Sequence, residues 1–404
     1  MRRTVYTEDH EAFRETIRAF IEAEVAPVYD EWFAAGQAPR DFYHKLGELG
    51  IFGINVSEEF GGAGLDTHKF EAVLYEETSR AGVNFGGSGA HVLLGLPYIK
   101  MLATDEQKKR FLPKIAAVEE LWCQGYSEPG AGSDLANVST KARLVSTGSS
   151  DEQAHYVIDG QKVWTSLAHV ADWCFVVART EPGSQRHRGL SYLLVPMDQE
   201  GVEVRAINQL TGTSEFNEVF FTAATTDCSN LVGDEGDGWR VAMATLGFER
   251  GISTIGQQVG FQRELDALLE VARSNGSYDD PVIRDRLAAA QVDLEVIRLN
   301  ALRTLSEDQA PQQASISKLL WAGWHRTLGE LAMQVRGADS LTTGPDYDLD
   351  EWQRLFLFTR ADTIYGGSDE IQRNVLAERV LGLPREQRRE QPGEPRSEQR
   401  SEAR

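Results

Sequence analysis

The segment WCQGYSEPGAGSDL, residues 122–135, opens the middle part of the chain and is rich in small and polar residues. Gly130 and Gly132 lack a Cβ, so a flat or anionic ligand can approach the backbone closely there. Ser127 and Ser133 add hydroxyl groups that donate or accept hydrogen bonds. Two interpretations are open: a ligand-binding loop, or a turn-rich connection between two domains.

The chain before this segment has a helical pattern. Apolar side chains recur at helical spacing at Phe13, Ile17, Phe20 and Ile21, and Pro27 ends the pattern. The same spacing returns around residues 42–49, and GGAG at 61–64 predicts a turn. We therefore expect an N-terminal helical domain over residues 1–120.

Residues 121–231 have the pattern of short strands. Tyr156 and Ile158 alternate with polar residues, and Asp159-Gly160 predicts a hairpin turn before QKVWTS. The runs WCFVV, GLSYLLVPM, VEV and EVFF predict further strands with turn residues between them. We expect a middle β domain here.

The helical pattern returns over residues 232–383. Leu265, Leu268 and Ala272 share one face with Leu269, and Asp280-Pro281 has the form of an N-cap followed by proline at the first helical position. Residues 384–404 contain no Val, Ile, Leu or aromatic residue. They cannot offset their ordering entropy, so we expect a C-terminal helical bundle followed by a disordered tail.

Composition excludes several classes of function. A net charge of −21 argues against binding to nucleic acid or to an anionic membrane surface. Three cysteines without CxxC spacing fit a reducing compartment, and no run approaches the roughly 18 apolar residues of a membrane span. We expect a cytoplasmic protein. The chain also lacks GxGxxG, GxxxxGK[ST], HExxH and GxSxG, which argues against a Rossmann unit, a P-loop enzyme and a simple hydrolase.

Five motifs together resemble the acyl-CoA dehydrogenase family. They are SEPGAGSD (127–134), KVWTS (162–166), FNEVFF (216–221), FERG (248–251) and YGGSDEIQRN (365–374). Their order and spacing match from about residue 7 to residue 383. The resemblance implies an α+β multidomain fold with an N-terminal helical domain, a middle β-barrel-like domain and a C-terminal four-helix bundle. FAD would lie between the last two, and a neighbouring subunit would complete its site.

The resemblance also implies which residues form the site. The FAD-binding residues would be Tyr126, Ser127, Gly132, Ser133, Trp164, Ser166, Gln334, Val335, Gly337, Ser368 and Glu370. Trp164 and Ser166 would flank the flavin ring, whereas Ser133, Arg250 and Gly366 would lie near the substrate. Arg250 has a second interpretation, a surface salt bridge.

The reaction implied by the resemblance needs a carboxylate that removes the α-proton while hydride leaves the β-carbon for the flavin. Many members of the family place this Glu where the present chain has Gly366. Glu249, in FERG, matches the position used by isovaleryl- and long-chain-type relatives. Three hypotheses are open: Glu249 is the base, Glu249 is a structural partner of Arg250, or the chain is a catalytically idle subunit.

A second departure concerns assembly. Residues 273–286 lack the RKQFG-like run that touches the neighbouring subunit's FAD in the family, and Arg284 or Arg286 is a candidate substitute. The resemblance implies an oxidoreductase of lipid metabolism and fatty acid β-oxidation, with an acyl-CoA substrate and an electron-transfer flavoprotein or similar acceptor. A homo-oligomer (dimer or tetramer) and a heterotetramer with an unlike dehydrogenase subunit are both open. Alternative functions are a non-catalytic FAD-binding subunit and a related flavin oxidase or monooxygenase.

Overall fold

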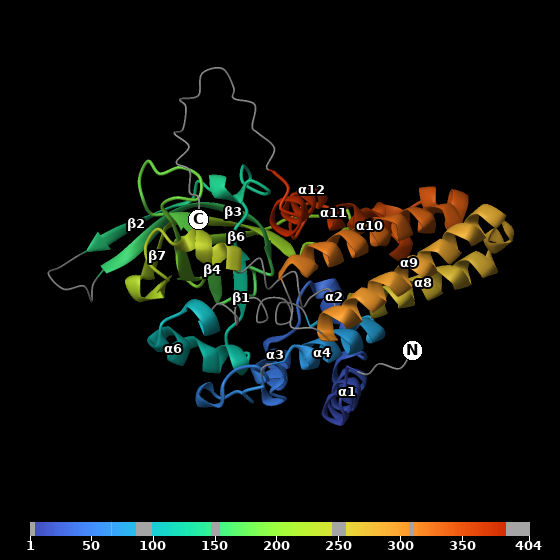
Figure 1. The fold of residues 1–404 in the computed structure, drawn as a ribbon, viewed down its shortest axis with the longest axis horizontal. Helices are drawn as coiled ribbons and strands as arrows, with labels where there is room; N and C mark the ends of the chain where they lie inside the picture. Colours follow the sequence, from blue (N-terminus) through green and yellow to red (C-terminus); the bar gives the residue numbers. More distant parts are fainter. Residues whose placement is uncertain are drawn as a thin grey trace, which may run out of the picture.

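The computed structural model describes residues 5–65, 67–85, 99–146, 154–244, 256–306 and 311–384. It consists of helices at both ends of the chain and a sheet between them (Figure 1). Three features expected from the sequence lie outside the described residues: Glu249, Arg250 and the tail after Pro384.

The N-terminal part is helical, as its apolar pattern predicts. Its helices are α1 (Glu8–Phe20), α2 (Tyr29–Ala35), α3 (Arg40–Glu48), α4 (Lys69–Ala81) and α6 (Asp105–Ala116). Ile17 and Ile21 are fully buried, and the chain turns at Pro27 as expected. This apolar face packs in one continuous core with Trp122 and Phe175 of the sheet, so the N-terminal helices and the sheet share their interior.

The middle part is an eight-stranded mixed sheet with the order β6-β7-β3-β2-β4-β5-β8, and β1 pairs with β4. The strands are β1 (Trp122–Gly125), β2 (Lys141–Ser146), β3 (Ala154–Ser166), β4 (Trp173–Arg179), β5 (Leu190–Pro196), β6 (Val202–Ala206), β7 (Phe216–Asp227) and β8 (Leu231–Val232). β5 and β7 are not neighbours in this order, yet the hydroxyl of Thr226 on β7 donates to the carbonyl of Leu194 on β5 over 2.5 Å, so the sheet curls enough to bring them together.

The hairpin predicted at Asp159-Gly160 is wrong. Both residues lie inside the continuous strand β3, at a register shift in its pairing with β7. Gly160 is needed for close packing, since a Cβ there would lie 2.4 Å from Oγ1 of Thr140. The Asp159 carboxylate accepts a hydrogen bond from the backbone N–H of Ala223 over 2.8 Å. A dipeptide typical of tight turns therefore forms a β-bulge here.

The C-terminal part is a helical bundle. Its helices are α8 (Gln257–Ser274), α9 (Pro281–Ser306), α10 (Pro311–Arg336), α11 (Glu351–Asp362) and α12 (Asp369–Val375). Leu265, Leu268 and Ala272 are fully buried on one face of α8, as predicted. The predicted cap at the start of α9 is also present, because the Asp280 carboxylate accepts from the backbone N–H of Val282 over 2.7 Å.

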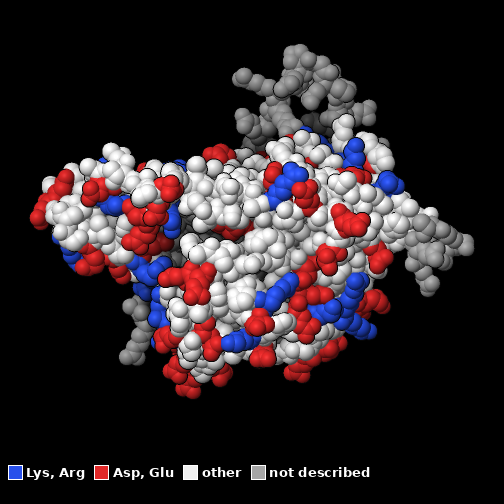
Figure 2. Space-filling view, turned by 180° about the vertical axis from the view of Figure 1, so that it is seen from behind, with Lys and Arg blue, Asp and Glu red and all other residues white. Residues whose placement is uncertain are grey.

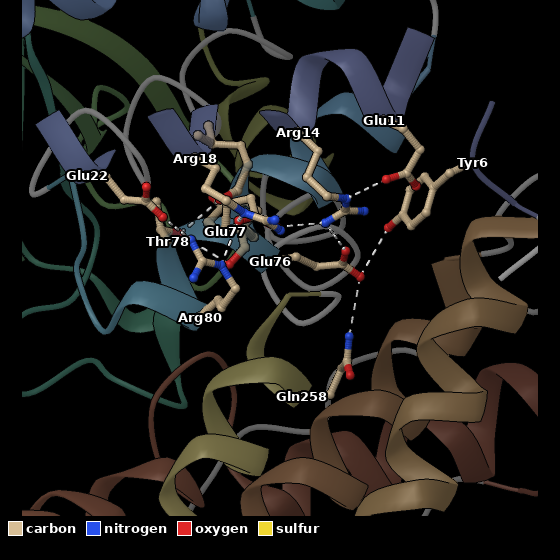
Figure 3. Close-up of polar contacts among 12 residues, drawn as sticks. Tyr6, Glu11, Arg14, Arg18, Glu22, Glu76, Glu77, Thr78, Arg80 and Gln258 are labelled. Carbon is tan, nitrogen blue, oxygen red and sulfur yellow. Dashed lines mark hydrogen bonds and ion pairs between the residues drawn. The ribbon is translucent and has the colours of Figure 1, made fainter. Parts of the chain in front are cut away.

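A polar network ties α1 and α4 to the start of α8 (Figure 3). The Glu77 carboxylate accepts hydrogen bonds from the guanidinium groups of Arg14, Arg18 and Arg80. Its neighbour Glu76 pairs with Arg14 over 2.8 Å and accepts from the side chain of Gln258 over 3.4 Å. Acidic and basic side chains are also interspersed over the N-terminal helices at the bottom of Figure 2. The network fixes the N-terminal helices to the bundle.

Candidate functional site

The connection between β1 and β2, residues 126–140, contains the SEPGAGSD motif and is called the SEPGAGSD loop here; it is anchored by a buried ion pair. Lys162, on β3, is fully buried, and its ammonium donates to the Glu128 carboxylate over 2.9 Å. It also donates to the backbone carbonyls of Tyr126 over 3.1 Å and Val177 over 2.7 Å. The start of the loop is therefore fixed to two strands of the sheet.

Glu128 also holds the end of the loop. Its carboxylate accepts from the backbone N–H and hydroxyl of Ser139, over 2.6 and 2.7 Å, and from the backbone N–H of Thr140 over 2.9 Å. Burial opposes ionisation of Glu128, but Lys162 and these donors outweigh it and hold its pKa at about 2. The carboxylate is thus ionised at neutral pH and fixes both ends of the loop.

The middle of the loop is open. A Cβ on Gly130 or Gly132 would meet no atom of the described residues within 4 Å, and Ser133 is exposed. Tyr126 points the other way: it is buried, and its hydroxyl donates to that of Tyr192 over 3.2 Å. The Ser127 carbonyl accepts from the backbone N–H of Val163 on β3 over 2.9 Å, next to Trp164. A fixed loop therefore presents bare backbone and one hydroxyl to a ligand.

Trp164 is unusual in two respects. Its φ is +60°, which is rare for a bulky side chain, and 57% of its surface is exposed. It lies at a register shift between β3 and β7, and its indole makes an edge contact with Phe216, with the ring centroids 6.1 Å apart. Ser166 follows on the same strand, paired with Phe216. Backbone strain that holds an aromatic ring in solvent is typical of a ligand-binding position, and the ring suits a flat heteroaromatic group.

The turn between α11 and α12 holds the next predicted site residues, Gly366, Ser368 and Glu370. Gly366 and Gly367 have φ values of +63° and +87°, and the buried side chain of Gln372 donates to both of their carbonyls. The Ser368 hydroxyl caps α12 by accepting from the backbone N–H of Ile371. The exposed Glu370 has a pKa below its usual value, because its own backbone N–H and Ser368 donate to it.

The remaining predicted FAD-binding residues lie elsewhere in the bundle; they are Gln334, Val335 and Gly337. Gln334 and Val335 lie in the last turn of α10 and Gly337 follows it, and this end of α10 lies at the tip of the bundle away from the sheet (Figure 1). There the Gln334 side chain accepts a hydrogen bond from the guanidinium of Arg286, and the Val335 carbonyl accepts from Asn275 on α8 over 2.8 Å. Arg284 instead donates to the Tyr278 carbonyl. Two separate groups of predicted FAD-binding residues thus occupy opposite ends of the bundle.

The sequence interpretation missed two charged groups next to these residues. Glu128 and Lys162 lie inside quoted motifs, and their charge was the signal that could have singled them out. The other group is His325 with Glu264 and Asp362, which lie 61 and 37 residues away in the chain. A lone histidine on a helix gives no such signal.

Among the described residues, no three His, Cys, Asp or Glu side chains are placed to bind a metal ion together. The helices in that same part of the chain are also too short or too polar to cross a membrane.

Comparison with protein families gives three matches that follow one another along the chain. Residues 7–119 match the N-terminal domain of acyl-CoA dehydrogenase, residues 123–224 its middle domain and residues 236–381 its C-terminal domain. Acyl-CoA dehydrogenase IpdE1 of Mycobacterium tuberculosis is 53% identical over 394 residues, covering 94% of this chain and 99% of that relative. IpdE1 of Mycolicibacterium smegmatis is 58% identical over 355 residues, covering 86% and 88%.

Solved structures agree with these matches. The Tcur3481–Tcur3483 steroid ACAD has a TM-score of 0.80 and 27% sequence identity, covering 94% of this chain and 99% of that one. The ChsE4–ChsE5 complex of Mycobacterium tuberculosis has a TM-score of 0.78 and 29% identity, covering 96% and 100%. Each of these two structures carries two component names, and the second is named as a complex.

Proposed function

Because the chain belongs to the acyl-CoA dehydrogenase family, we propose that it removes the α-proton of an acyl-CoA thioester with Glu249 and delivers the β-hydride to FAD. The family, the three-part fold, the enzyme class (an oxidoreductase) and the FAD cofactor predicted from the sequence are confirmed. The match of all three domains, in order, supports the assignment to this enzyme family. The identity of the base and of the residues that bind FAD and substrate is our proposal.

Two observations support Glu249 as the base. The usual position holds Gly366, which has no side chain to accept a proton. Among the described residues, a Cβ there would meet only Lys318, whose Cε would be 3.9 Å away, which leaves room for substrate beside Gly366 in this part of the structure. Glu249 occupies the position from which isovaleryl- and long-chain-type relatives supply the carboxylate. An apolar surrounding would raise the pKa of such a group toward neutrality and make it a better base.

The described residues fit FAD. The exposed indole of Trp164 offers a stacking surface for the flavin, and the bare backbone at Gly132 with the Ser133 hydroxyl offers donors beside it. Tyr126, Ser127, Ser166, Ser368 and Glu370 are the further residues that the resemblance assigns to it. When bound, FAD supplies the hydride acceptor. The chain itself removes the proton, orients the thioester and excludes water from the reacting carbons.

The site is completed by a second subunit in this proposal. Gln334, Val335 and Gly337 lie at the tip of the bundle, where they would reach the FAD of a neighbour. The guanidinium of Arg286 bonds to Gln334 at this tip, which favours Arg286 over Arg284 as the substitute for the missing RKQFG-like contact. The two-component names of the similar structures favour an unlike dehydrogenase subunit as the neighbour.

The substrate in this proposal carries a bulky, ring-containing acyl group, which the name of the similar steroid ACAD favours. Ser133 and Arg250 would contact its CoA part, and an electron-transfer flavoprotein or similar acceptor would reoxidise the flavin. The test is to purify the chain alone and with a candidate partner subunit, and to add straight, branched and cyclic acyl-CoAs without oxygen. Bleaching of the flavin by at least one thioester is expected. A protein that holds FAD but is reduced by none of them contradicts the proposal.

A further inference from the structure

A row of charged and polar side chains crosses the C-terminal bundle and ends at the turn before Gly366. It begins at Glu264 on α8, passes through His325 on α10 and Asp362 at the end of α11, and ends at Tyr365. His325 and Asp362 are buried, whereas Glu264 and Tyr365 reach the surface. None of these residues has a role in the function proposed above.

The geometry fixes the charge of His325. Its Nε2 lies 3.0 Å from Oε2 of Glu264, and its Nδ1 lies 2.7 Å from Oδ2 of Asp362. Ionised carboxylates only accept hydrogen bonds, so both ring nitrogens must carry a proton, and the ring is an imidazolium. Burial disfavours this charge, but the bonds to Asp362 and Glu264 outweigh burial and raise the pKa of His325 to about 9.

Asp362 also contacts the turn that follows α11. Its second oxygen, Oδ1, accepts the Tyr365 hydroxyl over 2.8 Å. The Asp362 carbonyl accepts from the ammonium of Lys318, which also lies 4.5 Å from the centre of the Tyr365 ring. Tyr365 is thus held at its hydroxyl and on one face of its ring. The residue that follows is Gly366, beside which the thioester would lie.

We propose that His325 is a positioning residue: held between Glu264 and Asp362, it fixes Asp362, which holds the Tyr365–Gly367 turn in the place where it meets the acyl-CoA. The inference rests on the proposed function for the identity of that ligand. The buried Asp362 carboxylate needs its cation, since an unpaired buried charge is strongly unfavourable. A small displacement of a positioning group lowers the rate or the affinity about 10- to 100-fold.

The test compares three variants of the FAD-loaded protein, together with any partner subunit it requires. Tyr365→Phe removes only the hydroxyl that reaches Asp362, His325→Gln removes the imidazolium, and Tyr347→Phe removes an exposed hydroxyl elsewhere as a control. The probes are enoyl-CoAs, straight, branched and cyclic, which bind without being oxidised at the α,β-bond. Their Kd is measured from the change in the flavin spectrum, alongside kcat and KM with acyl-CoA and the Tm.

We expect Tyr365→Phe to weaken enoyl-CoA binding or slow turnover about tenfold or more at a nearly unchanged Tm. His325→Gln should do the same with a lower Tm, and Tyr347→Phe should match the wild type. If His325→Gln does not fold, Tyr365→Phe decides alone. Wild-type Kd, kcat and KM in Tyr365→Phe overturn the inference. A wild-type protein that binds enoyl-CoA but oxidises no acyl-CoA contradicts the proposed function only, because the comparison of Kd values still tests His325.

Discussion

The ammonium of Lys162 and the carboxylate of Glu128 lie 2.9 Å apart, with both side chains almost completely removed from solvent. Burial alone lowers the pKa of Lys162, and Glu128 opposes that effect. The pair joins strand β3 to both ends of the SEPGAGSD loop, so it sets the position of the open glycines relative to Trp164.

Lys162→Met should destabilise the protein by about 3–5 kcal/mol and release FAD, because it leaves the Glu128 carboxylate buried without its cation. The double variant Lys162→Met with Glu128→Gln should lose less stability, since no uncompensated charge remains. Denaturant unfolding and the ratio of visible to ultraviolet absorbance measure the two effects. Arg205→Met is the matched control: its pair with Glu203 is exposed, so its loss should lower the free energy of unfolding far less than Lys162→Met does. Equal losses for both single variants would contradict this role.

Gly256 is the N-cap residue of α8 and lies in direct contact with α4. It follows Glu249 by seven positions in the chain. A Cβ on Gly256 would lie 2.3 Å from Cβ of Tyr75 and 2.9 Å from the backbone nitrogen of Glu76. Gly256→Ala should therefore displace α8, cost about 1–3 kcal/mol of stability and slow flavin reduction. Stopped-flow reduction by acyl-CoA and thermal unfolding check both effects.

Gly260, one turn further along α8, is the control for that substitution. A Cβ there would be 3.5 Å from Cβ of Ser79, an ordinary contact. Gly260→Ala should leave flavin reduction unchanged and stabilise the helix by up to about 1 kcal/mol. If both alanine variants reduce flavin at the wild-type rate, the contact between α8 and α4 does not position the catalytic segment.

Glu77 should make the stability of the protein sensitive to acid. Burial opposes its ionisation, but hydrogen bonds from Arg18, Arg80 and Arg14 outweigh burial and hold its pKa at about 2, against 4.5 for a free Glu (Figure 3). Because the folded-state pKa is the lower one, its contribution, up to about 3 kcal/mol, is present above pH 4.5 and is lost as the pH falls toward 2.

Denaturant unfolding of the wild type and Glu77→Gln checks this between pH 6 and 3. The difference between their free energies of unfolding should be largest at pH 6 and shrink toward pH 3. A difference that stays constant with pH would show that the carboxylate is not the source of the stability.

The extent to which the sequence predicts this protein differs from feature to feature. The helical faces of α1 and α8 and the cap at Asp280 followed from residues a few positions apart, and these are correct. The hairpin prediction at Asp159-Gly160 is wrong, because the same dipeptide also occurs in β-bulges. The packing of Thr140 against Gly160 decides between the two structures, and the local sequence does not show it. Motifs located the loop and Trp164, but not the strained φ that exposes the ring.

The sequence patterns could not predict contacts between residues that lie far apart in the chain. The partners of His325 come from two other helices, and the bond between Arg286 and Gln334 depends on where α9 and α10 meet at the tip of the bundle. Periodicity predicts which face of a helix is buried, but it does not predict which polar side chains meet across the interface.

Whether Glu249 removes the α-proton is tested by the rate at which an acyl-CoA reduces the flavin of Glu249→Gln without oxygen. The substitution keeps the shape of the side chain and removes the proton acceptor, so FAD binding should persist while reduction falls by at least about 10²–10⁴-fold. Loss of a salt bridge to Arg250 alone would cost about 0–1 kcal/mol and leave the rate nearly intact. Bleaching of the flavin in Glu249→Gln at the wild-type rate would contradict the account.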